Sequence, residues 1–512
     1  MENYKNRWSR EEILSLLVIS GLTLAVYLPS LGHEFLFNWD DNLYVLKNAA
    51  VRGFTVENLR QAFSGFYVGN YAPLHIISYM LDYELWGMRP AGFIATNVLL
   101  HTLNALLFYR IVFFMHGERT AALLAALVFA LHPIQVESVV WVSQRKNVLA
   151  MCFFLLSFLT YLRWTHGSGR SWRQYAPALV FFTAALLTKS VAVILPLLLL
   201  LYDATRPVVR RPGILLNKLP FLAIAILSAV LALASQAEDA GGGRTGYHGG
   251  SPFATACTML PVLFRYFALL FRPTNLSIVY DPPVRSGLDS TVLAALAGVI
   301  ALAMVAWWLW RRRKTTCFWF LAFFIALLPV AQIVPLVTLM NDRYLYFPML
   351  GFAALAGLAG ARMLHVLIER QAIAVAVATL LVLPLAGMAY QRTTVWQNSF
   401  ALWHDALYKS PHSASVWYGL GDVYLEQEKT GLARTAYETA LARGGSEPDL
   451  LANLAIVAAA EGRIDDAFTL LKKAIELGYK DVEEMSSDRH LAALRRDRRF
   501  KLLLEQYFPG GK

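Results

Sequence analysis

The chain has 512 residues, of which 57% are apolar and only 16% are charged, and its formal net charge at pH 7 is +11. Repeated long apolar runs in such a composition exclude an ordinary soluble enzyme and predict a polytopic membrane protein. The positive charge does not point to nucleic acid, because Lys and Arg gather in short loops between apolar runs. The three cysteines have no motif spacing, which argues against a disulfide framework or a zinc site.

About eleven apolar segments are predicted to span the membrane as helices. Their limits are 13–31, 92–115, 120–135, 147–163, 174–188, 190–203, 219–235, 290–310, 315–335, 345–364 and 371–390. The region 174–203 is interpreted as a hairpin that turns near Lys189, since basic residues flank it on both sides and favour the cytoplasm. Fifteen helical residues reach only about 22 Å, against roughly 30 Å of hydrocarbon. Lys189 would then lie recessed near the outer face, as a functional cation or as a lysine that snorkels to water.

The distribution of basic residues also predicts the orientation of the chain. "RRRK" at 311–314 and the N-terminus are expected in the cytoplasm. The segments 32–91, 132–146, 236–289 and 336–344 then face outside, and the apolar stretch 254–271 is expected on or partly in the outer leaflet.

Residues 392–512 change to a soluble helical pattern, which separates them from a membrane domain over 1–391. In "VWYGLGDVYLEQEKTGLARTAYETALARG", Trp417, Leu420, Gly421, Tyr424, Ala433, Tyr437 and Ala440 have tetratricopeptide spacing. Small and apolar residues recur 34 positions later at Leu454, Ala467, Leu471 and Ala474. The predicted fold class is therefore all-α, a polytopic helical bundle followed by an α-solenoid of about three repeats on the outer side.

Acids, cations and tyrosines gather in four of the outward segments. They are Asp40 and Asp41 in "FNWDDNLYVLKN"; His132, Glu137, Arg145 and Lys146 in "HPIQVESVVWVSQRKNVLA"; Lys189; and Arg343, Tyr344 and Tyr346 in "NDRYLYFPMLG". Together they suggest a base combined with a clamp for an anion such as phosphate. Each also has a plainer interpretation, as a solvated loop, a helix-ending turn or an interfacial anchor.

These stretches, with "YAPLHIISYMLDYELWGMRPAGFIATNVLLHTLNALLF" and the terminal repeats, resemble the transmembrane-and-tetratricopeptide O-mannosyltransferases, which are GT-C membrane glycosyltransferases. The resemblance runs over nearly the whole chain, which looks like a bacterial member. It implies inverting sugar transfer from a polyprenyl-phosphate donor to protein hydroxyls. The family's acidic motif corresponds to Asp40-Asp41, with Asp40 as the base, and its basic positions correspond to Arg145, Lys189 and Arg343. The chain departs from its relatives at Ile94, where they often have His, and at Asn147, where they often have an acid.

The implied chemistry accounts for an acid beside cations at a membrane face. A Ser or Thr hydroxyl that attacks a sugar carbon needs a base, and the departing phosphate needs cations. Asp40 and Asp41 could instead hold a divalent metal, but a lone acidic pair favours the base, and no firm cofactor is expected. The expected partners are the lipid-linked donor, carrying mannose or another hexose, membrane lipid, and an acceptor protein engaged by the repeats. The expected location is a bacterial inner membrane with the repeats in the periplasm.

Two other functions fit parts of the sequence. An oligosaccharide ligase would share the lipid-phosphate chemistry but move a longer glycan. A membrane-anchored tetratricopeptide scaffold would explain the repeats, but it would leave Asp40, Lys189 and Arg343 without a use.

Overall fold

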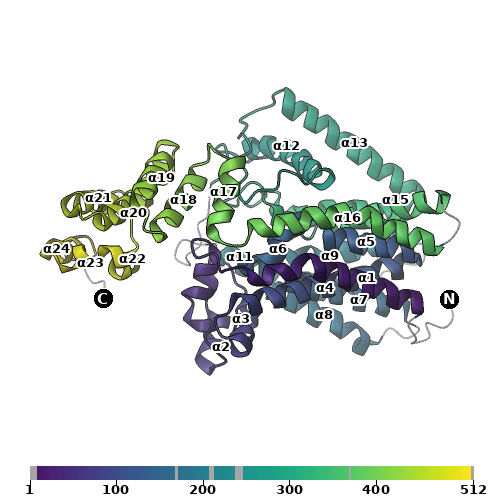
Figure 1. Cartoon of the computed structure of the whole chain (residues 1–512). Coiled ribbons are helices and arrows are strands. Elements are labelled where there is room, and N and C mark those ends of the chain that lie inside the picture. Colours follow the sequence, from purple (N-terminus) through teal and green to yellow (C-terminus); the bar gives the residue numbers. More distant parts are fainter. Residues whose placement is uncertain (1–8, 168–170, 207–212, 237–245, 368–370, 509–512) are drawn as a thin grey trace. The chain divides into compact units, whose positions relative to one another are not determined.

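A computed structural model describes residues 9–167, 171–206, 213–236, 246–367 and 371–508. Throughout these ranges the chain is built of helices and their connections (Figure 1). It divides into two compact units, one comprising the chain up to Leu276 together with Pro282–Asn398, the other comprising Ser277–Asp281 and the chain from Ser399 onward. Residues 237–245, part of the predicted outward segment 236–289, lie outside the described ranges.

The first unit is organised around a fully buried helix, α5 (Arg119–Leu131), in which every residue from Thr120 onward is buried. Around it pack α1 (Arg10–Tyr27), α4 (Pro90–His116), α15 (Met349–Leu367) and α16 (Gln371–Val395), and α7 (Arg145–His166) packs against α4 (Figure 1). The backbones of α5 and α15 touch, because a Cβ added at Gly357 would lie 2.5 Å from the carbonyl oxygen of Ala121. This close approach of small residues is typical of helices packed within membranes.

The remaining helices of this unit surround the bundle or belong to its loops. They are α2 (Val56–Ser64), α3 (Pro73–Trp86), α6 (Val136–Val140), α8 (Trp172–Leu186), α9 (Leu195–Ala204), α10 (Gly213–Leu216), α11 (Leu219–Ser235), α12 (Pro252–Phe271), α13 (Ser290–Arg312) and α14 (Lys314–Leu327). The break predicted near Lys189 is confirmed, since α8 ends at Leu186 and a 3₁₀ turn, η6 (Ser190–Ile194), leads into α9.

The predicted number of spans is wrong. Among the described residues six helices are long and apolar enough to cross a membrane, or seven if α5 and α6, which are bent by 50°, form one span. The six are Arg10–Gly32, Pro90–His116, Val142–His166, Pro252–Phe271, Ser290–Arg312 and Met349–Val366. The apolar runs at 190–203, 219–235 and 315–335 form shorter helices, below the roughly 20 residues that a span needs. The stretch 254–271, expected on the outer leaflet, lies instead in α12, which is long and apolar enough to span.

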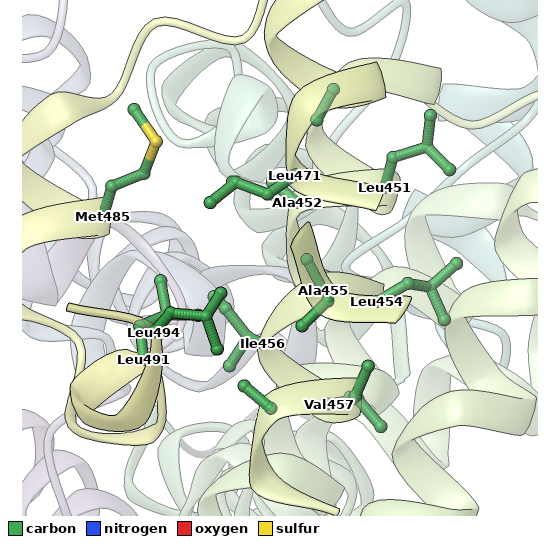
Figure 2. Packing of buried hydrophobic residues seen from close by; sticks show 14 of the residues in the cluster. Leu451, Ala452, Leu454, Ala455, Ile456, Val457, Leu471, Met485, Leu491 and Leu494 are labelled. Atoms are coloured by element: carbon green, nitrogen blue, oxygen red, sulfur yellow. The ribbon is translucent and has the colours of Figure 1, made fainter. Parts of the chain in front are cut away.

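The second unit consists of antiparallel helix pairs, as the repeat pattern predicts. They are α18 (Ala414–Glu426) with α19 (Thr430–Ala442) and α20 (Glu447–Ala460) with α21 (Ile464–Glu476). Before them lies α17 (Ser399–Lys409), and after them come α22 (Val482–Ser487), α23 (Ala492–Arg496) and α24 (Arg498–Tyr507). All residues from Leu450 to Ala459 in α20 are buried. Figure 2 shows side chains of α20 and α21 packing with Met485, Leu491 and Leu494 from the segments that follow. No single pair could bury its apolar face alone.

The contact of α18 with α19 leads to a stability prediction. A Cβ added at Gly421 would lie 2.4 Å from the ring of Tyr437, which is held by a 2.8 Å hydrogen bond from its hydroxyl to Asp422. Gly421→Ala should therefore destabilise this unit by roughly 1–3 kcal/mol, the usual cost of overpacking. Faster hydrogen exchange in α18 and α19 of the full-length protein would report it.

Gly431→Ala is the matched control, because nothing lies within 4 Å of a Cβ added at this exposed helical position. Its exchange should be unchanged or slower, since Ala favours a helix by about 1 kcal/mol over Gly. Equal effects of the two substitutions would contradict the proposed packing of Gly421.

Candidate functional site

A cavity of about 410 Å³ lies within the first unit. Its polar lining includes Asp40, Asn70, Tyr71, Gln144, Lys146, Asn147, Lys189, Ser228, Ser235, Gln236, Arg343 and Tyr344. Its apolar lining includes Val191, Val193, Ala229, Ala232, Leu233, Pro329, Val330, Val334, Leu336 and Phe347. The cavity thus combines a charged wall with an apolar wall, which suits a ligand with an anionic head and a hydrocarbon tail.

The two adjacent aspartates have different surroundings. Asp40 lines the cavity, and a third (33%) of its side chain is exposed. Asp41 is 1% exposed. One of its oxygens, Oδ1, accepts hydrogen bonds from the backbone N–H (2.9 Å) and the hydroxyl of Ser143, and Oδ2 accepts one from the backbone N–H of Leu36 (3.1 Å). Asp41 therefore joins the first loop to the segment before α7, while Asp40 remains available to a ligand.

Lys146 is the nearest cation to Asp40. Its Nζ lies 3.8 Å from Asp40 Oδ2, 3.3 Å from the hydroxyl of Tyr44 and 4.6 Å from the centre of that ring. Burial would make an unpaired ammonium costly, and these contacts offset part of that cost. Lys146 is thus held at the cavity wall beside the exposed acid.

Lys189 reaches the cavity from the break between α8 and α9. Its Nζ donates a 2.6 Å hydrogen bond to Asn147 Oδ1. The amide nitrogen of Asn147 donates to Ser138 Oγ (2.9 Å) and Gln144 Oε1 (3.1 Å), which fixes the orientation of the amide. Lys189 is therefore positioned by a neutral amide, and this contact does not neutralise its positive charge.

Arg343 is the third cation of the cavity wall. Its guanidinium donates a 2.6 Å hydrogen bond to Glu137 Oε1, and its backbone N–H donates a 2.8 Å bond to Glu137 Oε2. The guanidinium also lies 5.5 Å from the ring centres of Trp141 and Tyr344. Glu137 is 2% exposed and does not line the cavity, so its carboxylate supports Arg343 from behind.

Five of the sequence-predicted site residues do not line this cavity: Asp41 and Glu137, described above, and three more. Arg145 is buried and bonds to Asp82 Oδ2 (2.5 Å), Phe93 O (2.6 Å) and Asn97. The other two are also buried in hydrogen-bond networks: His132 lies 3.0 Å from Leu270 O, and Tyr346 bonds to His101 (2.9 Å) and Asn104 (3.1 Å). These side chains join segments of the bundle to one another. Because they do not line the cavity, its geometry does not support the direct substrate contacts expected of them.

The lining also contains polar residues that the sequence analysis did not single out. Asn70, Tyr71 and Gln144 line the cavity and carry no charge, so no charge pattern could identify them. The turn that presents Asn70 and Tyr71 has one recognisable sign, since Val68 and Gly69 both have positive φ angles, of 48° and 66°. Such backbone is costly for Val and often marks a functional turn.

The donor set of the Asp pair does not fit a shared metal. Both oxygens of Asp41 are already occupied by the donors of Leu36 and Ser143. In the part of the chain that the structure describes, no three or more His, Cys, Asp or Glu side chains gather as a group.

The surroundings of Asp41 predict a pH-dependent stability. Burial raises the pKa of its carboxyl from 3.8 to about 6, although the hydrogen bonds from Ser143 and Leu36 oppose this rise. A pKa raised by folding means that the folded state is favoured below the unfolded pKa and loses stability as the pH rises through 6. Relative to Asp41→Asn, which does not titrate, the wild type should lose up to roughly 3 kcal/mol between pH 4 and pH 7.

Unfolding of the two proteins in detergent across this pH range would measure the difference, in which other titrating groups cancel. A relative gain of the wild type with rising pH would mean that the three hydrogen bonds outweigh burial.

Comparisons with known proteins show which families, proteins and structures the chain resembles. A model described as dolichyl-phosphate-mannose-protein mannosyltransferase matches residues 73–235, and a tetratricopeptide repeat model matches residues 418–481. Protein O-mannosyl-transferase Tmtc1 of Drosophila melanogaster is 30% identical over 211 residues, which cover 40% of this chain and 24% of that protein. Protein O-mannosyl-transferase F38B6.6 of Caenorhabditis elegans is 23% identical over 459 residues, which cover 85% and 64% of the two chains.

A solved structure, ArnT from Cupriavidus metallidurans bound to undecaprenyl phosphate, is 16% identical and covers 90% of this chain and 77% of that one. Its TM-score of 0.38 is too low to define a shared fold. The chain spans less than two thirds of the length of each of the two protein O-mannosyl-transferases. Both of its parts are nevertheless matched, which confirms the chain's resemblance to the transmembrane-and-tetratricopeptide O-mannosyltransferases.

Proposed function

We propose that the protein is a GT-C type membrane glycosyltransferase that moves a sugar, mannose or another hexose, from polyprenyl phosphate to Ser or Thr hydroxyls of proteins. The observation that carries this proposal is the cavity in which Asp40 meets Lys146, Lys189 and Arg343 beside an apolar wall. A soluble substrate would not need the apolar wall, whereas a polyprenyl chain would lie along it while its phosphate meets the cations.

The pairing of charges in the cavity favours a single phosphate group. Lys146 lies beside the carboxylate of Asp40, and Arg343 is bonded to the carboxylate of Glu137. Lys189 is bonded to a neutral amide, so its contact adds one positive charge without an acid to balance it. A phosphodiester carries one negative charge, and charge-assisted hydrogen bonds from Lys and Arg are strong in such a partly buried place.

In the proposed reaction, Asp40 accepts the proton of the acceptor hydroxyl as its oxygen forms a bond to the anomeric carbon of the sugar. The bond from that carbon to the phosphate oxygen breaks, and its electron pair stays on the departing polyprenyl phosphate. Lys189 and Arg343 stabilise the charge that grows there. Direct displacement of this kind inverts the configuration at the sugar carbon. No step needs a metal.

The rest of the chain supports delivery of the two substrates. The apolar helices keep the cavity within reach of a membrane-bound donor. The tetratricopeptide repeats provide a surface of the kind that binds peptides, and we assign to them the acceptor protein. We place the cavity and the repeats on the periplasmic side of a bacterial inner membrane, with a cytoplasmic N-terminus.

Two alternatives differ in what they require of the cavity. An oligosaccharide ligase would use the same phosphate chemistry with a longer glycan. A scaffold would need no partly buried acid beside three cations, and such a group is costly to fold without a ligand to bind. The cavity therefore favours an enzyme over a scaffold.

Asp40→Asn is the direct test of the proposed base. It keeps the shape of the side chain but cannot accept the hydroxyl proton, so transfer should fall by roughly 10²-fold or more. Glu57→Gln, at an exposed site of the same outward loop, is the matched control and should transfer normally. Transfer by purified protein to a Ser/Thr peptide would be followed by intact mass.

The mass of the product and the effect of a chelator distinguish the remaining interpretations. Increments of one hexose support the proposal, larger increments support the ligase, and no transfer by the wild type would leave the scaffold. Full activity of Asp40→Asn would remove Asp40 as base. Inhibition of the wild type by a chelator would show that a metal takes part.

Asn147 offers a test of the phosphate site that leaves the base untouched. Asn147→Asp would place a carboxylate 2.6 Å from Lys189 Nζ and neutralise its charge with little change in shape. The KM for the lipid donor should rise about tenfold, equivalent to about 1.4 kcal/mol, while the KM for the acceptor stays the same. An unchanged donor KM would show that Lys189 does not contact the phosphate.

A further inference from the structure

A second hollow lies in the first unit, toward the other end of α15. Arg343 precedes the first residue of α15, whereas Arg362 lies 13 residues beyond Met349, a distance of about 20 Å at the rise of an α-helix. Around Arg362 are two overlapping cavities of about 660 and 670 Å³. We call them together the basic groove; it is lined by the ends of α13 and α15, the start of α14, and His116 and Glu118.

The basic groove is lined by both apolar and cationic side chains. Trp308, Leu355 and Met363 are among the apolar ones, and Arg313 and Arg362, both exposed, are the cationic ones. Among the described lining residues, Glu118 is the one that carries a carboxylate. Its Oε1 lies 2.8 Å from Nε2 of His365. The two guanidiniums therefore give the groove an excess of positive charge.

The residues around the basic groove are typical of a membrane–water interface. Arg311 lies over the ring of Trp307 and Lys314 over that of Trp310, each 5.6 Å from the ring centre. Tryptophans at headgroup level and basic residues on the cytoplasmic side mark such a boundary. We therefore expect the cationic side chains of the groove at the depth of lipid headgroups, and its apolar side chains at the depth of acyl chains.

The helix that forms one side of the groove, α13, packs against α12 and α14 but is mostly exposed. In the apolar window of α13 only 17% of the residues are buried inside the protein, and Trp307 and Trp308 are 64% and 51% exposed. The basic groove is lined by residues of both α13 and α15, so a ligand in it would contact both helices.

We propose that the basic groove binds one anionic phospholipid of the leaflet that faces the cytoplasm. The phosphate would accept hydrogen bonds from Arg313 and Arg362, and the upper acyl chains would lie against Trp308, Leu355 and Met363. Guanidinium groups are suited to phosphate, and basic pockets between membrane helices recognise anionic headgroups in this way. The bound lipid holds α13 against α15, so it stabilises the folded protein. This site is separate from the Asp40 cavity and does not depend on the activity proposed there.

Native mass spectrometry of the purified full-length protein tests the proposal. The detergent-solubilised wild type would be titrated with phosphatidylglycerol and, separately, with phosphatidylcholine of the same acyl chains. We expect one phosphatidylglycerol to be retained per chain, at least fivefold in preference to phosphatidylcholine. We also expect phosphatidylglycerol to raise the apparent melting temperature.

The variant Arg313→Gln/Arg362→Gln should lose most of this retention and the thermal shift. Arg60→Gln/Arg272→Gln removes the same charge from exposed positions outside the groove and should behave as the wild type. If the double groove variant does not fold, the single Arg362→Gln, at an exposed position, should reduce retention by a smaller factor.

Four outcomes would overturn the proposal. They are equal retention of the two lipids, unchanged retention in the groove variants, an equal loss in both double variants, which would reflect net charge alone, and lipid-free dimers, which would place a second copy in the groove.

Discussion

The buried carboxylate of Asp41 is the contact on which the proposed site depends. It joins the backbone of Leu36 in the first loop to the backbone and hydroxyl of Ser143, just before α7. Ser143 is three residues from Lys146, so this one junction brings Asp40 and Lys146 to the same wall. A buried acceptor with three donors is hard to replace, because any neutral substitute leaves at least one donor without a partner. The two aspartates are therefore adjacent for different reasons, one for structure and one for the ligand.

The second constraint is the cost of holding three cations around one cavity. Each has a partner that fixes it from the protein side: Asp40 for Lys146, Asn147 for Lys189 and Glu137 for Arg343. The partners differ in charge, and this decides how much attraction remains for an anion. Glu137 accepts two hydrogen bonds from Arg343. These bonds orient Arg343, and the negative charge of Glu137 weakens the attraction of Arg343 for an anion. Asn147 orients Lys189 without reducing its charge. The cavity is thus pre-organised for an anion yet not strongly positive when empty.

Hydropathy located the helices well, because apolar runs and helical runs coincide in a membrane protein. It overestimated the number of spans because the position where a helix ends depends on local backbone, as at Lys189 between α8 and α9. The sequence also singled out Asp40, Lys146, Lys189 and Arg343, since charged residues beside apolar runs are conspicuous, and the structure places these four around one cavity. It could not show which of the neighbours Arg145 and Lys146 lines the cavity. Successive residues of a helix point in directions about 100° apart, so only one of the two can face it. Arg145 turns inward to Asp82, and only the packing of α3 against α7 reveals that partner.

The two positions at which the chain departs from its relatives, Ile94 and Asn147, have different consequences, because only one of them lines the cavity. Ile94 is 1% exposed and lies outside the cavity lining, so an apolar residue there is satisfied by packing alone. Asn147 lies in the cavity wall and holds Lys189 directly. An acid at this position would pair with Lys189 and compete with the donor phosphate, whereas the amide preserves the geometry and leaves the charge to the ligand. The substitution at Asn147 therefore alters the electrostatics of the proposed donor site, and the one at Ile94 does not.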